Sequence, residues 1–142
     1  DLGDMTFHFA VAPFHPLASA NQPITDEMLK AHRLIVVADS ALRENTSMGL
    51  LEGQEIFTVD NLQTKIQAQV RGIGCGFLPE NLLQPYQKNG SLVIKKVCRS
   101  TRQIRMRYTW SLSNNMHAGR ALQWWLEQLE SSTTREALVQ NP

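Results

Sequence analysis

Polar residues follow two short apolar runs, at positions where a sheet protein can bind a ligand. Residues 38–40 come directly after the apolar run 34–37, and residues 60–61 come directly after the run 56–59. Such β-branched runs are typical of strands that are buried on both faces. Ligands of open α/β sheets bind at the carboxyl ends of the strands. The sequence therefore predicts a polar binding crevice formed by 38–40 and 60–61, and the alternative interpretation is that these residues are only caps and turns.

The segment after Val59 predicts a helix whose first turn can attract an anion. Asp60 is placed to cap this helix, and Gln63 has the spacing of a capping box. Gly72 is placed to end it, and one apolar stripe is formed by Leu62, Ile66 and Val70. Free N–H groups and the helix dipole favour an anion at the N-terminus, although a carboxylate cap would occupy some of those donors.

The motifs of common enzyme classes are missing from the sequence. There is no GxSxG elbow, no P-loop, no GxGxxG after a strand and no HExxH. The run Gly72–Gly76 follows a helix and leads into a strand, which is the reverse of the order in a phosphate-binding loop. No ligand-like spacing relates the histidines to one another or to the cysteines; they are His8, His15, His32 and His117. We therefore expect neither an enzyme nor a metal site.

Two cysteines raise a second hypothesis, which is redox sensing. Cys75 lies among glycines in an expected buried strand, and Cys98 ends another expected strand. Buried structural thiols of this sort are usually inert. We therefore expect both to be structural, and a regulatory disulfide between them is the alternative.

Positive charge is concentrated in one segment of an otherwise balanced sequence. The chain has 142 residues and a formal net charge of +1, with 42% apolar and 19% charged residues, which is typical of one globular domain. Six bases lie close together; they are Lys95, Lys96, Arg99, Arg102, Arg105 and Arg107. A basic patch can bind nucleic acid, but residues 104–112 alternate apolar and polar side chains as a half-buried strand does. We therefore expect these bases to lie on the solvated face of two strands.

Strand and helix signals alternate along the chain, which predicts an α/β fold with a largely parallel sheet. Strands are expected at Thr6–Ala12, Leu34–Val37, Ile56–Val59, Gly74–Pro79, Leu92–Val97 and Ile104–Leu112. Helices are expected at 26–31 with Thr25 as N-cap, between Asp60 and Gly72, at 80–86 and at 117–129, the last with Ala118, Leu122, Trp125 and Leu129 inward. The sequence beyond Glu130 shows no pattern. No run has the length of a membrane span, and the first residues do not have the basic and apolar regions of a signal peptide.

Several segments, in this order, resemble the regulatory domain of LysR-type transcriptional regulators. They are Phe9-Ala-Val-Ala-Pro-Phe-His-Pro-Leu-Ala18, Phe57-Thr-Val-Asp-Asn-Leu62 and Val70-Arg-Gly-Ile-Gly-Cys-Gly-Phe-Leu-Pro79. The resemblance covers Thr6 to Leu129, and within the family it is to the YhaJ-type regulators. It implies an α/β, periplasmic-binding-protein-like (type II) fold of two lobes. On this mapping, residues 1–12 are a crossover strand, 13–104 a nearly complete lobe II, 105–130 the return strand and last helix of a partial lobe I, and 131–142 a flexible tail.

The resemblance also implies a function. A small-molecule effector, an acid or an aromatic compound, would bind between the lobes without any cofactor and alter the arrangement of DNA-binding heads in a cytoplasmic homo-oligomer. The residues that the resemblance and the strand ends together suggest for effector binding are Val37, Ala38, Asp39, Ser40, Asp60, Asn61, Phe77 and Trp110. Phe77 and Trp110 are the weaker candidates, because each also fits a core position.

The expected lobe arrangement leaves out parts that the resemblance would require. The chain has no initiator Met and no basic recognition helix, so we expect a fragment that does not bind DNA by itself. The 117–129 helix would then leave apolar surface without its usual partner, which favours oligomerisation or partial disorder there. The alternatives are a solute-binding protein of similar fold and a redox-sensing regulator that uses Cys75 and Cys98.

Overall fold

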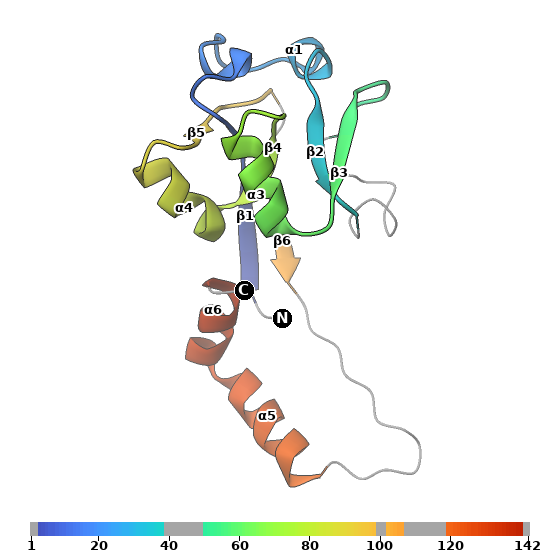
Figure 1. Cartoon of the computed structure of the whole chain (residues 1–142). Coiled ribbons are helices and arrows are strands. Elements are labelled where there is room, and N and C mark those ends of the chain that lie inside the picture. The colour runs from blue at the N-terminus through green and yellow to red at the C-terminus, as the bar shows by residue number, and fades with distance from the viewer. Residues whose placement is uncertain (1–2, 39–49, 99–101, 107–118, 141–142) are drawn as a thin grey trace. The chain divides into compact units, whose positions relative to one another are not determined.

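The computed structural model describes residues 3–38, 50–98, 102–106 and 119–140. Its strands are β1 (Gly3–Val11), β2 (Leu34–Val37), β3 (Ile56–Val59), β4 (Gly76–Pro79), β5 (Val93–Ile94) and β6 (Arg102–Met106). Its helices are the 3-10 turn η1 (Pro16–Ala18), α1 (Asp26–Lys30), α3 (Leu62–Val70), α4 (Glu80–Lys88), α5 (Arg120–Glu130) and α6 (Ser132–Gln140), as Figure 1 shows. The chain divides into two units, Phe7–Arg102 and a smaller one that combines Asp1–Thr6 with Gln103–Pro142.

The strands of the larger unit run in both directions. β2 and β3 are parallel, with Leu34 opposite Ile56 at one end. β1 is antiparallel to both β4 and β5, and one parallel bridge joins Leu34 of β2 to Cys75 just before β4. The expectation of a largely parallel sheet is therefore wrong, because β1 crosses the unit in the opposite direction to β4. The α/β class itself is confirmed.

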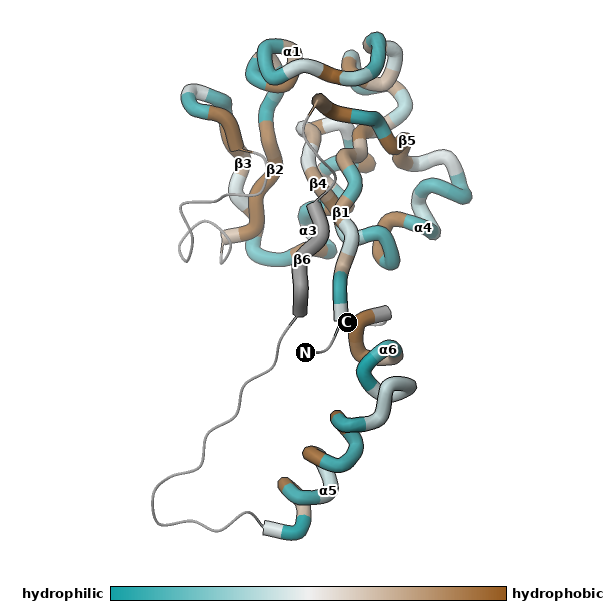
Figure 2. The backbone as a smooth tube through the Cα atoms, turned by 180° about the vertical axis from the view of Figure 1, so that it is seen from behind, coloured by the Kyte–Doolittle hydropathy of each residue, from teal (hydrophilic) through white to brown (hydrophobic). Residues whose placement is uncertain are grey.

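Helix α3 joins the two sheets of this unit. It contacts β2, β3 and β4, and Figure 2 colours much of β2 and β3 as hydrophobic. On one side, Ile66 packs in a cluster with Ala10, Leu78, Leu83 and Leu92. On the other side, Ala68 packs with Ile35 and Val59. The helix therefore holds β2–β3 and β4–β1 in one core.

Local signals explain most of the boundaries. The Thr25 hydroxyl accepts a hydrogen bond from the Met28 N–H at 3.3 Å, so the expected N-cap of α1 is confirmed. Gly72 ends α3 with a φ of +71°, a conformation that residues with a side chain rarely adopt. β2 and β3 have the expected bounds, whereas the expected strand 92–97 is paired only at Val93–Ile94 and, through one bridge, at Val97.

The smaller unit contains β6, which pairs with β1, and the contacting helices α5 and α6. The expectation that Trp125 faces inward is wrong, because Trp124 and Trp125 are both 52% exposed and stack edge to face on each other. The residues beyond Glu130 show no periodic pattern, but Ser132–Gln140 forms α6. The Arg135 N–H donates to the Ser131 carbonyl at 3.1 Å, and good helix formers such as Glu136, Ala137 and Leu138 follow.

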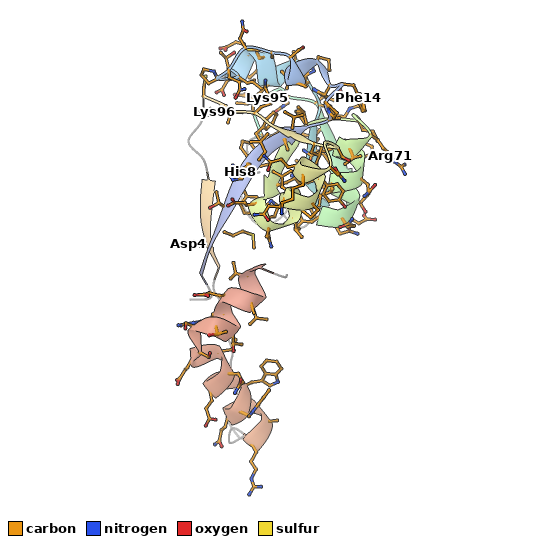
Figure 3. The ribbon with its side chains drawn as sticks, turned by 90° about the vertical axis from the view of Figure 1, so that its left-hand side faces the viewer. Asp4, His8, Phe14, Arg71, Lys95 and Lys96 are labelled. Atoms are coloured by element: carbon orange, nitrogen blue, oxygen red, sulfur yellow. The ribbon has the colours of Figure 1, made fainter. Side chains whose placement is uncertain are left out.

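The basic segment is not uniformly solvated. Lys95 is buried, and its ammonium donates to the carbonyls of Ala18 at 2.9 Å and Ala20 at 3.0 Å, so it fastens β5 to the end of η1. Its neighbour Lys96 is exposed, and Figure 3 labels both residues below the segment that contains η1 and α1. The solvated face expected for these bases is therefore wrong for Lys95.

Candidate functional site

The carboxyl ends of β2 and β3 lie side by side. In the parallel register Val37 is opposite Val59, so Ala38 and Asp60 leave neighbouring strands at the same edge. Val37 and Ala38 are half-buried, and Asp60 and Asn61 are exposed. This is the arrangement that the two apolar runs predict. Three further candidates, Asp39, Ser40 and Trp110, lie outside the residues that the structure describes.

Asn61, and not Asp60, caps helix α3. Its side-chain oxygen accepts hydrogen bonds from the Thr64 N–H at 2.9 Å and from the Thr64 hydroxyl at 3.1 Å, and its φ of −154° is extended. The helix therefore begins one residue later than Asp60 and Gln63 predicted, because both residues of the pair Asp60-Asn61 can cap and the chain turns at the second. The cap is therefore a neutral amide and not the carboxylate expected from Asp60.

Phe77 is part of the core of the larger unit. It is 4% exposed, and its ring lies edge to face on Phe9 with the centroids 5.4 Å apart. Phe9 and Phe77 are also opposite each other in the antiparallel pair of β1 and β4. These are the contacts of a core residue, which is the alternative that the sequence offers for Phe77.

Lys65 is a functional candidate that the sequence analysis missed. It lies on α3 one turn after Asn61 and is only 6% exposed. The buried face of α3 consists of Lys65, Ile66, Ala68 and Gln69. It includes Ile66 of the expected stripe, whereas Leu62 and Val70 are only half-buried, Val70 against the cluster of Ile66. Burial lowers the pKa of Lys65 to about 8, and the nearby Cys75 opposes this shift when it is a thiolate.

Lys65 and Gln69 meet over Gly76 of β4. A Cβ at Gly76 would lie 3.2 Å from Cε of Lys65, 3.1 Å from Nε2 of Gln69 and 3.2 Å from the carbonyl oxygen of Ile35. The absent side chain of Gly76 is what lets both polar side chains lie against the sheet. Gln69 Nε2 donates to the Ala10 carbonyl at 3.2 Å, whereas its Oε1 is buried without a hydrogen-bond partner.

Neither cysteine is paired in a disulfide. Cys75 is fully buried and donates to the Arg33 carbonyl at 3.4 Å, and burial raises the pKa of its thiol to about 12. A thiol with so high a pKa is almost entirely protonated at neutral pH and is a poor nucleophile. Cys98 is exposed. Within the described ranges no group of three or more His, Cys, Asp or Glu residues could hold a metal ion.

Residues 1–133 match the protein family described as the LysR substrate binding domain. The chain belongs to this family. It is 40% identical to YeeY of Escherichia coli, an uncharacterised HTH-type transcriptional regulator. The 129 aligned residues cover 90% of this chain and 41% of YeeY. It is 34% identical over 93 residues to the HTH-type transcriptional activator AllS of Klebsiella pneumoniae, with 65% of this chain and 34% of AllS covered.

Solved structures of LysR-family regulatory domains have the same fold. The regulatory domain of MetR from N. meningitidis superimposes with a TM-score of 0.58 at 21% identity, over 72% of this chain and 49% of that one. The regulatory domain of CcmR from Synechocystis PCC6803, solved in complex with 2-PG, gives 0.58 at 15% identity, over 99% of this chain and 65% of that one. The periplasmic-binding-protein-like (type II) α/β fold is therefore confirmed, and the chain is an effector-binding regulatory domain of the LysR type. The chain spans less than half the length of YeeY and of AllS.

Proposed function

We propose that the full-length protein is a DNA-binding transcriptional regulator in which this domain senses a small-molecule effector at the carboxyl edge of β2 and β3. The observation that carries the proposal is the parallel register of Val37 and Val59, which brings the segments that begin at Ala38 and Asp60 to one edge. Parallel strands of α/β sheets bind ligands at this edge. Residues 37–40 and 60–61 are the proposed contacts.

The rest of the proposal follows from the family. DNA binding belongs to chain outside these 142 residues, as the HTH-type relatives suggest. The working form is a homo-oligomer in the cytoplasm that requires no cofactor and catalyses no reaction, and its effector is a small acid or aromatic compound. Placement among the YhaJ-type regulators remains a prediction. Among the described helices, none is long and apolar enough to cross a membrane.

Full-length variants test the site. Asp39→Ala and Asp60→Ala should shift the effector concentration that changes operator binding, while affinity for operator without effector stays as in the wild type. Asn61→Ala belongs in the same series, with its loss of stability measured separately because Asn61 caps α3. Effector curves that are unchanged in Asp39→Ala and Asp60→Ala would contradict the site. A ligand-binding protein that binds no operator DNA at all would favour the solute-binding alternative.

A further inference from the structure

The larger unit has two buried lysines, and their ammonium groups are in opposite situations. Lys95 is 7% exposed and donates to two main-chain carbonyls. Lys65 is 6% exposed, and no side-chain hydrogen bond or ion pair from it occurs in the described part of the chain. A lysine buried for a purely structural reason is expected to resemble Lys95, because a buried cation without partners is strongly destabilising.

A second polar group beside Lys65 also has no partner. The Oε1 atom of Gln69 is buried without a hydrogen bond, although Nε2 of the same amide holds the Ala10 carbonyl. Both side chains end over Gly76. A buried acceptor without a partner is rare in a folded protein and indicates that a partner is missing here. The Lys65 ammonium is not among the fully buried atoms without a partner, so it keeps some access to solvent.

The charges around Lys65 and Gln69 indicate the chemical class of the missing partner. Lys65 is not a member of the ion pairs His8–Glu80 and Arg33–Glu55. With a pKa of about 8, most Lys65 side chains carry a positive charge at pH 7. The N-terminal end of α3, capped by the neutral Asn61, adds a partial positive charge one turn away. The positive charge of Lys65 therefore favours an anion with oxygen acceptors, and Gln69 Oε1 requires a hydrogen-bond donor on the same ligand.

We propose that Lys65 anchors an oxyanion of the effector, a carboxylate or phosphate group, over Gly76 between α3 and strands β2 and β4. This inference rests on the proposed function, because it assigns the chemical class of the same domain's effector. An oxyanion would accept hydrogen bonds from the Lys65 ammonium and remove the cost of an uncompensated buried charge. Gln69 Oε1 would accept from a hydroxyl or N–H group of the same ligand.

The first test uses inorganic phosphate and sulfate as probes on the full-length protein, with chloride at equal ionic strength as reference. Millimolar phosphate should raise the Tm of the wild type by about 2–5 °C through preferential binding to the folded state. Lys88→Met is the matched control, because Lys88 is an exposed lysine at the end of α4, and it should keep the whole shift. Lys65→Met should lose it. The same Tm shift in wild type and Lys65→Met, or no shift in the wild type, would overturn the proposal.

A direct titration keeps the proposal testable even where Lys65→Met does not fold. NMR of the wild-type protein with ¹³Cε-labelled lysines follows the Lys65 pKa, which should rise from about 8 when phosphate is added. A Lys65 pKa that phosphate leaves unchanged would overturn the anchor.

Matched ligand pairs separate this inference from the proposed function. Benzoate with benzamide, and lactate with lactamide, differ in the carboxylate that Lys65 is proposed to hold. A compound that stabilises wild type and Lys65→Met equally would overturn the anchor but leave the sensing function standing. An acid whose stabilising effect is lost in Lys65→Met, and whose amide has no effect, supports both.

Discussion

The side chain of Lys65 lies directly over Gly76: its Cε is 3.2 Å from the point that a Cβ at Gly76 would occupy. This relationship links helix α3 to strand β4 at the place where α3 joins the two sheets of the larger unit. It also explains why a lysine and a glutamine can be buried on a helix whose predicted apolar stripe does not include them.

Alanine at the glycines before and within β4 should be destabilising in a defined order. A Cβ at Gly74 would meet the Arg33 carbonyl oxygen at 2.5 Å, whereas the nearest atoms to a Cβ at Gly76 lie at 3.1–3.2 Å. Overpacking of this type costs about 1–3 kcal/mol. We expect Gly74→Ala to lower the free energy of unfolding more than Gly76→Ala, as measured by urea denaturation.

A double-mutant cycle can measure the interaction between Lys65 and a side chain at position 76. Lys65→Ala should recover part of the stability that Gly76→Ala removes, since it takes away one of the three nearest atoms. Strict additivity of the two substitutions would show that Lys65 and Gly76 do not contact each other.

Replacing Lys65 should stabilise the protein at neutral pH when no ligand is present. Its pKa falls from 10.5 to about 8 on folding, which corresponds to a destabilisation on the order of 3 kcal/mol at pH 7. We expect Lys65→Met to raise the free energy of unfolding by roughly 1–3 kcal/mol in urea denaturation at pH 7. Lys95→Met is the matched control with the opposite sign, because it removes two hydrogen bonds to carbonyls and should be destabilising.

The same shift gives a pH dependence with a definite sign. Between about pH 8 and 10.5 the unfolded chain holds the Lys65 proton more tightly than the folded chain, so wild-type stability rises with pH. Cys75 opposes this above pH 9, because its thiol pKa is raised to about 12 in the folded state. The rise between pH 8 and 9 should therefore be present in wild type and absent in Lys65→Met; equal slopes would contradict the burial of the ammonium.

Asn61 should contribute the stability of a helix cap, and Asp60 should not. Asn61→Ala removes the oxygen that accepts from the Thr64 N–H and should cost about 1 kcal/mol. Asn61→Asp keeps an acceptor and should be close to wild type, and Asp60→Ala should change little because Asp60 is exposed. Thermal denaturation of the three variants would contradict the assignment if Asp60→Ala were the most destabilised.

His15 should make the domain sensitive to acid. Burial, and secondly the charge of His32 with its ring 5.0 Å away, lower the pKa of His15. The unfolded chain therefore takes up the proton first, and stability falls as pH drops below 6.5. In the wild type, His15 Nδ1 accepts a hydrogen bond from the Leu17 N–H. His15→Asn keeps an acceptor for this hydrogen bond. It should flatten the fall in Tm between pH 6.5 and 5, and an unchanged fall would contradict the assignment to His15.

The sequence predicted those parts of the fold that depend on neighbouring residues. β2 and β3 have the expected bounds because β-branched runs fit a strand buried on both faces. Tertiary contacts decided the rest. Lys65 looks like a surface lysine, and only its spacing from Gln69 and the glycine-rich run before Pro79 suggest that both side chains pack on a glycine of β4. Lys95 lies in a basic segment, yet the carbonyls of Ala18 and Ala20 make it a buried donor, and no local pattern shows that.

The measurement that most directly tests the central claim is a thermal-shift screen of the full-length protein against small organic acids and aromatic compounds. A ligand present at a hundred times its Kd should add about 2.7 kcal/mol of stability. We predict that acids will stabilise the wild type, that Asp60→Ala and Lys65→Met will weaken this effect, and that the same acids will change operator binding. A well-folded protein that no acid stabilises, or whose stabilising ligands leave operator binding unchanged, would contradict the account.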